Sequence, residues 1–310
     1  MLAAVRSATL LGVDGQPVTV EVHVSNGLPA YQVVGLPDAA VRESRERVRA
    51  AVLSSGLEWP QRRITVNLAP GGVRKTGSGL ELAVALGVLG ASDALPAGVL
   101  EGVAVLGEVG LDASVRPVPG TLALVDALAR AGVECVVVPI ANAAEAALVG
   151  GVRVRAARTL GELRACLKGE EAWPDWEPAS PVATAAVGDA DELADLADVR
   201  GLPFARSALE VAAAGGHHLL LCGPPGTGKT MLAHRLGTIL PPLAHAEALE
   251  VTRIHSAAGV PLAGQLVSAR PFRAPHHTAS TAALVGGGSG RARPGEITMA
   301  HGTVTGTGTQ

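Results

Sequence analysis

Alternating apolar and polar side chains over residues 17–24 predict a β-strand with one face buried. Three further strands are predicted from Val-rich segments, at residues 63–70, 102–111 and 134–140. Helices are predicted between the strands, at residues 39–55, 79–90 and 120–132. Because strands and helices interleave, the first part of the chain is predicted to be an α/β layer fold.

Capping signals support these helices. Asp38 and Ser78 stand where the first two helices begin, and their short side chains are suited to accept a hydrogen bond from a free backbone N–H group of the first turn. The third helical segment begins and ends with glycine. We therefore predict Asp38 and Ser78 as N-caps.

A second α/β unit is predicted later in the chain. A helix is expected at residues 205–216, a short buried strand at 217–223, and a further helix at 229–241 that ends at Pro241. The order of strand, glycine-rich loop and helix is the context that a phosphate-binding loop requires.

The two units are separated by a segment without periodicity. Residues 169–190 contain three prolines together with acidic and small residues, a composition typical of a linker. We therefore divide the chain into a first domain at residues 1–168, a linker at 169–190 and a second domain at 191–310.

Composition places the chain among globular proteins. Hydrophobic residues make up 48% of its 310 residues, charged residues 17% and aromatic residues 2%, so the core is built from Ala, Val and Leu. No run reaches the roughly 18 apolar residues of a membrane helix, and Arg6 and Asp14 interrupt the first apolar stretch. A cytoplasmic location without a membrane partner is predicted.

Charge and cysteine content add little to the prediction of function. The net charge is −3, but residues 231–310 carry six arginines, no lysine and three glutamates, a local charge of +3. That surplus is too small to identify a nucleic-acid-binding protein. Cys135, Cys166 and Cys222 are far apart and lack CxxC spacing, which argues against disulfides and a zinc site and predicts buried thiols.

The strongest chemical signal is the segment GPPGTGKT, which matches the phosphate-loop (P-loop) pattern G-x-x-x-x-G-K-[ST] in full. Glycines let backbone N–H groups approach phosphate oxygens, and the helix N-terminus adds its dipole. Lys229 is predicted to reach the β- and γ-phosphates, and the Thr230 hydroxyl to bind Mg²⁺. ATP and Mg²⁺ are the predicted cofactors. The predicted nucleotide-binding residues are Gly223, Pro224, Pro225, Gly226, Thr227, Gly228, Lys229, Thr230 and Met231.

Hydrolysis requires a further group, usually an acidic residue after a later apolar strand that holds Mg²⁺ and orients water. Beyond Lys229 the chain has no Asp, and its carboxylates are Glu247, Glu250 and Glu296. None of them follows an apolar run. Catalytic residues therefore stay unknown, and ATPase activity of this chain is left open.

The second unit resembles the YifB/ComM family of magnesium-chelatase-like AAA+ ATPases. Residues 198–236, 270–288 and 293–302 carry the resemblance, which extends over residues 1 to about 302. It implies hexameric rings that hydrolyse ATP and, for ComM, branch migration of DNA during natural transformation. Related chelatase subunits use ATP to insert magnesium into a porphyrin.

The end of the chain departs from the family pattern. In the family, the segment that corresponds to residues 295–302 leads into an apolar strand ending in Asp-Glu, the Walker B motif. Here the Thr-rich residues 303–310 follow, and we interpret them as an out-of-frame reading or a fragment end. The resemblance then implies a partial AAA+ domain that lacks Walker B, the sensor residues and the lid.

The first domain resembles the Lon-protease-like fold (ribosomal S5 type), also found in the recombination factor RadA. Lon's catalytic serine position falls on Gly79 and its lysine position on Leu122, so the resemblance implies a non-proteolytic domain. Ser78 and Lys75 leave a displaced dyad open. The preferred role is assembly or DNA contact, with Arg74 and Lys75 as phosphate contacts; an ordinary solvated loop is the alternative.

Several other polar residues have two interpretations. Asp198 and Arg200 resemble the stretch that borders the adenine in this family, while helix capping is the plain alternative for Asp198. His217 and His218 are not expected to share a metal ion, because neighbours on a strand point to opposite faces. For the pair His276–His277, a metal site is likewise one interpretation.

A proline-rich loop carries Arg270 and Arg273, which in the family would face the ring pore or a neighbouring subunit. DNA contact through these arginines is one hypothesis. The alternative is a structural loop in which they pair with Glu247 or Glu250.

The family resemblance and the missing acidic residue leave three functions open. The first is an ATP-dependent DNA motor of the ComM type, of which this chain is the front piece. The second is a nucleotide-binding or assembly module that does not hydrolyse ATP. The third is a metal-insertion ATPase of the chelatase type.

Overall fold

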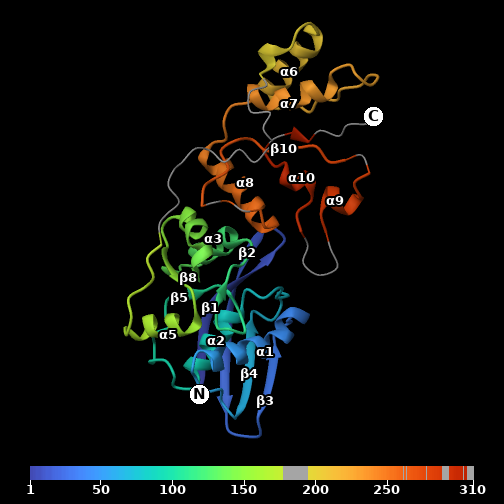
Figure 1. The fold of residues 1–310 in the computed structure, drawn as a ribbon. Helices are drawn as coiled ribbons and strands as arrows, with labels where there is room; N and C mark the ends of the chain where they lie inside the picture. Colours follow the sequence, from blue (N-terminus) through green and yellow to red (C-terminus); the bar gives the residue numbers. More distant parts are fainter. Residues whose placement is uncertain are drawn as a thin grey trace.

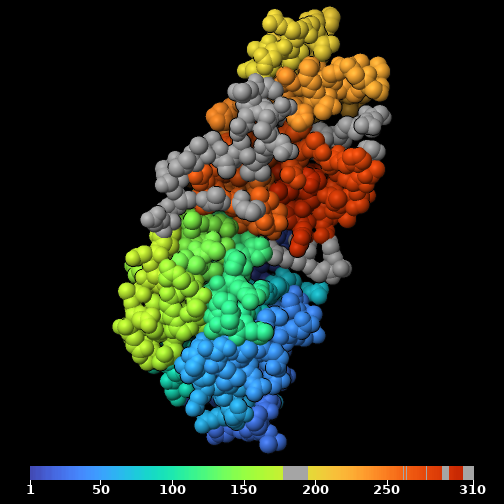
Figure 2. Space-filling model, viewed as in Figure 1, coloured from blue at the N-terminus to red at the C-terminus, as the bar shows by residue number. Residues whose placement is uncertain are grey.

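The computed structural model describes residues 1–176, 195–260, 262, 264–276, 278–287, 293–302 and 304–305. A seven-stranded sheet covered by helices lies at one end of the molecule, and helices α6 and α7 lie at the other (Figure 1). The predicted α/β class is confirmed. Figure 2 shows the second part, in yellow, orange and red, extending from one end of the first.

The main sheet has the strand order β3-β4-β2-β1-β5-β8-β9 and is mostly parallel, with antiparallel pairs at β1·β2 and β2·β4. Its strands are β1 (Leu2–Leu11), β2 (Asp14–Ser25), β3 (Ala30–Val34), β4 (Arg63–Ala69), β5 (Val103–Val105), β8 (Cys135–Pro139) and β9 (Arg153–Ala157). The strands predicted at residues 17–24, 63–70 and 134–140 are confirmed in β2, β4 and β8. The segment 102–111 instead splits into β5 and β6 (Glu108–Val109), and β6 pairs with β7 (Val115–Arg116).

Helices cover both faces of this sheet. Apolar side chains of α1 (Ala39–Ser54), α2 (Glu81–Gly90) and α5 (Leu160–Lys168) share one core cluster with β2 and β4. On the other face, α3 (Thr121–Arg130) and α4 (Ala143–Ala146) pack against β1, β5 and β8, and two 3₁₀ turns flank α4, η1 (Ile140–Asn142) and η2 (Ala147–Val149). Neighbouring side chains of one strand therefore enter different cores, as the pleat of a strand requires.

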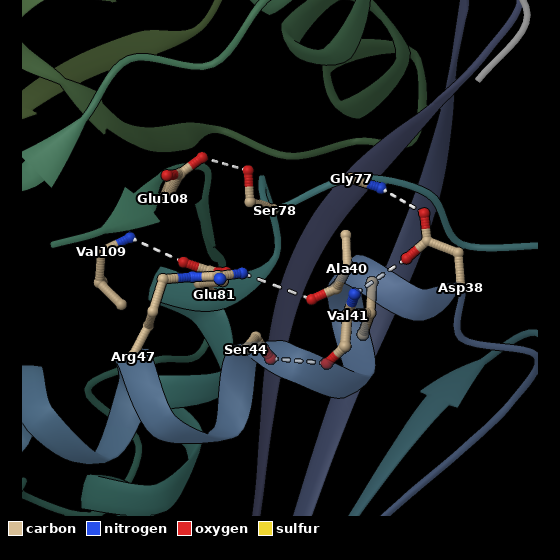
Figure 3. A network of polar contacts seen from close by, with 10 residues as sticks. All are labelled: Asp38, Ala40, Val41, Ser44, Arg47, Gly77, Ser78, Glu81, Glu108 and Val109. Carbon is tan, nitrogen blue, oxygen red and sulfur yellow. Dashed lines mark hydrogen bonds and ion pairs between the residues drawn. The ribbon is translucent and has the colours of Figure 1, made fainter. Parts of the chain in front are cut away.

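One of the two predicted N-caps is wrong. The Asp38 carboxylate accepts a hydrogen bond from the Val41 backbone N–H at 2.9 Å, so Asp38 caps α1 as predicted. Ser78 does not cap α2, which begins at Glu81. Its hydroxyl donates instead to the Glu108 carboxylate (Figure 3). The nearby charged acceptor is a stronger partner for the hydroxyl than a neutral backbone group.

Helix α2 approaches the sheet closely at Gly87. A Cβ atom at this position would lie 2.5 Å from a methyl carbon of Val22 in β2. We expect Gly87→Ala to lower the free energy of unfolding by about 1–3 kcal/mol through overpacking, measured by denaturant unfolding. Gly161→Ala in α5 is the control, because its Cβ finds open space beyond a 3.9 Å contact. Equal effects of the two substitutions would contradict the packing argument.

The second part is mainly helical. The predicted helices at residues 205–216 and 229–241 are confirmed. Its elements are η3 (Leu196–Asp198), α6 (Pro203–Gly215), α7 (Lys229–Ile239), α8 (His245–Ala258), α9 (Thr281–Val285) and α10 (Glu296–Met299), with β10 (Phe272–Arg273) paired in parallel to β11 (Val304–Thr305). The Thr-rich tail thus adds a two-residue strand there, and residues 306–310 lie outside the described residues.

The buried strand predicted at residues 217–223 is wrong. The segment pairs with no strand in the described part of the chain, and Leu220 within it is 85% exposed. A strand interior needs neighbours that satisfy its backbone groups and cover its side chains. The apolar run alone does not supply them.

Helix α8 connects the two parts by packing against α3 (Figure 1). The Arg253 guanidinium lies 3.6 Å from a carboxylate oxygen of Asp14 and 3.8 Å from one of Asp126. The Ser256 hydroxyl donates to the Glu145 carboxylate. Arginine on one part thus meets acidic side chains on the other.

Candidate functional site

The P-loop connects the extended segment at residues 217–223 to helix α7. Gly226 and Gly228 have φ angles of 80° and 85°, a conformation that side-chain-bearing residues rarely adopt. Gly228 directly precedes the first helical residue, Lys229. The loop therefore needs its glycines for backbone shape, and it presents the N-terminus of α7 to solvent.

The Lys229 side chain folds back over the loop. Its ammonium group donates to the carbonyl oxygens of Gly223 and Pro224 at 2.7 and 2.8 Å. The Thr227 hydroxyl donates to the same Pro224 carbonyl at 2.9 Å. Thr230 is exposed in the first turn of α7. The Lys229 ammonium group and the Thr230 hydroxyl therefore both belong to the N-terminal turn of α7. Such an arrangement is suited to phosphate and Mg²⁺.

Of the predicted residues Asp198 and Arg200, Asp198 lies in η3, which contacts α7, and Arg200 is exposed just after it. Asp198 ends η3, and its carboxylate accepts from the Asp195 backbone N–H at 3.1 Å. The N-cap of η3 is Asp195, and Asp198 is its partner in a capping box, whereas α6 begins at Pro203 with Leu202 before it. Arg235 of α7 donates to the Asp195 carbonyl at 3.1 Å and fastens this turn to the helix.

Leu202 is a neighbour of the loop that sequence reasoning missed. Its φ of 53° is left-handed, and its Cδ1 atom lies 3.7 Å from the position that a Cβ on Gly228 would occupy. A branched residue in this conformation is strained. Helical periodicity cannot reveal such a position, because the strain depends on how α6 enters the structure.

The carboxylates that follow the loop are engaged elsewhere. Glu247 accepts from the Ala244 backbone N–H at 2.8 Å, and Glu250 lies 3.4 Å from the His301 imidazole. Glu296 accepts from Arg273 at 2.6 and 2.8 Å, and this pairing holds the pKa of Glu296 below its usual range. The structure thus gives each of these glutamates a structural partner.

The two arginines of the proline-rich loop stabilise the structure locally. Arg270 donates to the Pro241 carbonyl at 2.7 Å and lies 3.6 Å from Glu247, as the structural alternative predicted. Arg273 pairs with Glu296, so its predicted pairing with Glu247 or Glu250 is wrong. Arg273 pairs with Glu296 because the chain reverses and brings α10 beside β10. The distance between these residues in the sequence does not reveal this contact.

Helix α8 carries a buried histidine, His255, which contacts α10. His255 is 0% exposed, and its Nε2 atom lies 3.1 Å from the Met299 carbonyl oxygen. Burial lowers the pKa of His255, so the folded state disfavours its protonated form. The unfolded chain binds the proton more readily, and stability is therefore lost as the pH falls through about 6.5, the unfolded value.

We expect the second part to unfold more easily at pH 5.5 than at pH 7.5, with a slope of up to about 1.4 kcal/mol per pH unit from His255. Denaturant unfolding over this pH range measures the change in stability. Hydrogen exchange of α8 then shows whether the change is located in this helix. His255→Gln is expected to flatten the slope, while His234→Gln, at an exposed position on α7, serves as the control. An unchanged slope in His255→Gln would refute the assignment.

The candidate residues of the first domain do not form a hydrolytic site. Lys75 is 0% exposed, and its ammonium group donates to the Pro70 carbonyl, so the predicted phosphate contact by Lys75 is wrong. Ser78 contacts Glu108 instead of Lys75, so the displaced dyad is not assembled (Figure 3). Leu122 is buried, and Arg74 is exposed. Of the two predicted phosphate contacts, only Arg74 remains accessible.

The cysteines and the paired histidines differ in their exposure. Cys166 is buried, Cys135 is half-buried, and Cys222 is exposed beside the P-loop, so the prediction of three buried thiols is wrong for Cys222. The extended segment that contains Cys222 lacks the neighbouring strands that would cover it. His217 and His218 are both exposed, and His277 lies outside the described residues.

Two features are absent from the described residues. Within them, no group of three or more His, Cys, Asp or Glu side chains is arranged to hold a metal ion. None of the helices in this part of the chain combines the length and apolar content that a bilayer span requires.

Fold and site together define an α/β protein with a P-loop motif. Residues 20–142 match a family model described as subunit ChlI of Mg-chelatase, and residues 195–305 match one described as magnesium chelatase, subunit ChlI. The chain belongs to the YifB/ComM family of magnesium-chelatase-like proteins.

Three relatives illustrate the similarity. An uncharacterised protein of Mycobacterium tuberculosis is 50% identical over 297 residues, which is 95% of this chain. YifB of Salmonella typhimurium is 45% identical over 97% of the chain, and the competence protein ComM of Haemophilus influenzae is 41% identical over 96%. The chain spans 58% of the length of each of these relatives.

Proposed function

We propose that residues 223–231 bind the triphosphate of ATP together with Mg²⁺. The observation that carries this proposal is the full P-loop pattern on a loop whose glycines have positive φ and lead directly into α7. Lys229 would exchange its two carbonyl contacts for phosphate oxygens, and Thr230 would hold Mg²⁺. Mg²⁺ would supply charge neutralisation of the phosphates.

We further propose that this chain by itself binds ATP without hydrolysing it. The three glutamates that follow the loop are occupied by Ala244, His301, Arg270 and Arg273. A carboxylate held by an arginine in two hydrogen bonds is poorly suited to orient water at Mg²⁺. Full-length relatives would complete the site with residues outside the span of this chain.

Binding and turnover are tested separately. Isothermal titration with ATP is expected to give saturable binding in Mg²⁺ and weaker binding in EDTA, while phosphate release stays at the level of the Lys229→Ala variant. Absence of ATP binding at millimolar concentration would reject the nucleotide proposal. Phosphate release above that of Lys229→Ala would reject the proposal of binding without turnover.

The larger function proposed is that of a DNA motor of the ComM type, with hexameric assembly in the cytoplasm. It is supported by the similarity to ComM and by the resemblance of residues 1–168 to a Lon-like, non-proteolytic domain, joined by the linker at 169–190 to the AAA+ part at 191–310. The two matching family descriptions favour a chelatase-type ATPase as the second candidate. Enhanced ATP affinity in the presence of DNA supports the motor, and enhanced affinity in the presence of a magnesium-free porphyrin supports the chelatase.

A further inference from the structure

Helix α1 carries three aligned arginines, of which Arg42 and Arg45 are exposed and Arg49 is half-buried. Arg42, Arg45 and Arg49 are spaced i, i+3 and i+7, which aligns them along the helix. We name these three residues the α1 arginine stripe. Because a helix rises by about 1.5 Å per residue, the stripe is about 10 Å long. Arg47 points elsewhere, to the buried Glu81 (Figure 3).

The stripe retains its positive charge. In the described part of the chain, neither Arg42 nor Arg49 has a carboxylate within 4.0 Å, and the buried Nε atom of Arg49 has no hydrogen-bond partner. The Arg42 guanidinium donates to the Pro37 carbonyl at 3.2 Å. Arg45 lies 3.6 Å from Glu46, but both side chains are exposed and such pairs contribute little.

Aromatic residues and a further arginine extend the surface. The Arg45 guanidinium lies over the Tyr31 ring, 5.7 Å from its centroid, and the Trp59 ring is 6.2 Å from that of Tyr31. This cation–π contact holds the guanidinium in place without neutralising it. Arg74 is exposed on the loop whose next residue pairs with Asp38, at the N-terminus of α1. Arg74 therefore adds a basic side chain near the N-terminus of α1.

Several basic side chains at the opposite edge of the same sheet are paired with carboxylates. Near β9, Arg158 pairs with Glu162, and Lys168 and Arg164 both pair with Glu170. Arg153 and Arg155 of β9, by contrast, have no carboxylate within 4.0 Å in the described residues. What distinguishes the α1 arginines is therefore their alignment along one helix.

We propose that the α1 arginine stripe binds the phosphate backbone of a nucleic-acid strand. Guanidinium groups spaced by about 4.5 and 6 Å along a line suit a linear polyanion. The acidic flank of α1, with Glu43 and Glu46, disfavours a flat anionic surface such as a membrane. Arg270 and Arg273, the arginines of the DNA hypothesis, are occupied internally. The proposal rests on the nucleic-acid part of the proposed function and names its site.

The test replaces Arg42, Arg45 and Arg49 by Gln in the full chain, since Gln keeps helix propensity and removes charge. Fluorescence anisotropy with a labelled 30-nucleotide strand and with its duplex gives the affinity as a function of salt. Each lost contact is expected to reduce the log–log salt slope by about 0.7 for the single strand or 0.9 for the duplex. The affinity at low salt is expected to fall at least tenfold.

Arg153→Gln on β9 is the matched control, an exposed arginine at the opposite edge of the sheet. Unchanged affinity and slope in the triple variant, or an equal loss in the control, overturns the assignment of the stripe while the DNA function stands. No binding of either oligonucleotide by the unaltered chain overturns both. ATP titration of the same samples reports the nucleotide proposal independently.

Circular dichroism establishes whether the triple variant folds. If it does not, arginine modification by phenylglyoxal is followed by mass spectrometry on the unaltered chain. Protection of Arg42 and Arg45 by DNA, with Arg153 still reactive, supports the stripe. Equal modification of all three in the presence and absence of DNA overturns it.

Discussion

Arg47→Ala is expected to lower the free energy of unfolding of the first domain by about 3–5 kcal/mol, because it leaves a buried carboxylate without its cation. Glu81 is 1% exposed and accepts from the Arg47 Nε at 2.9 Å and from the Val109 backbone N–H at 3.1 Å (Figure 3). Denaturant unfolding at pH 8 measures the loss. This is the largest stability effect that we expect from a single polar substitution in the chain.

The pH dependence of this variant identifies its cause. Burial raises the pKa of Glu81, and removing Arg47 removes the contact that opposes that increase. A carboxyl with a raised folded pKa loses stability as the pH rises through that pKa, so Arg47→Ala is expected to cost less at pH 5 than at pH 8. Adding Glu81→Gln retains an acceptor for Val109 and is expected to recover most of the loss. No recovery in the double variant would contradict the ion-pair explanation.

Lys229→Ala is expected to weaken ATP binding about 10- to 150-fold, because a charge-assisted hydrogen bond to phosphate contributes roughly 1.5–3 kcal/mol. Titration calorimetry with ATP and with inorganic tripolyphosphate measures the loss, which is expected to be the same for both ligands. The reason is that Lys229 lies at the loop carbonyls of Gly223 and Pro224, where phosphates would bind.

Lys168→Ala is the control for this substitution, since Lys168 pairs with Glu170 at the end of α5 in the first domain. Its ATP affinity is expected to equal that of the unaltered chain. Equal affinity in Lys229→Ala and the unaltered chain would remove the P-loop from the proposed function. A thermal melt of Lys229→Ala guards against loss of the loop itself, which Lys229 helps to hold.

Helix α8 contacts both parts of the chain. Its Arg253 and Ser256 contact acidic residues of the first part, while its buried His255 contacts the Met299 carbonyl of α10 in the second. One helix therefore touches both the part with the seven-stranded sheet and α10.

Features that repeat at short range are predictable from the amino-acid sequence. Alternation over residues 17–24 predicts β2 correctly because the pleat of a strand imposes a period of two on any strand with one buried face. The P-loop is recognisable because its glycines and lysine serve a local backbone shape. The Asp38 cap is predictable for the same reason, since its partner is three residues away.

Partners that are distant in sequence depend on the three-dimensional fold. Ser78 contacts Glu108 rather than the start of α2, Lys75 is buried, and Arg273 pairs with Glu296. Burial and pairing of this kind depend on which segments the fold brings together, and loop segments have no period that reveals it. The segment at 217–223 shows the same limit, because an apolar run becomes a buried strand only where neighbouring backbone satisfies its hydrogen bonds.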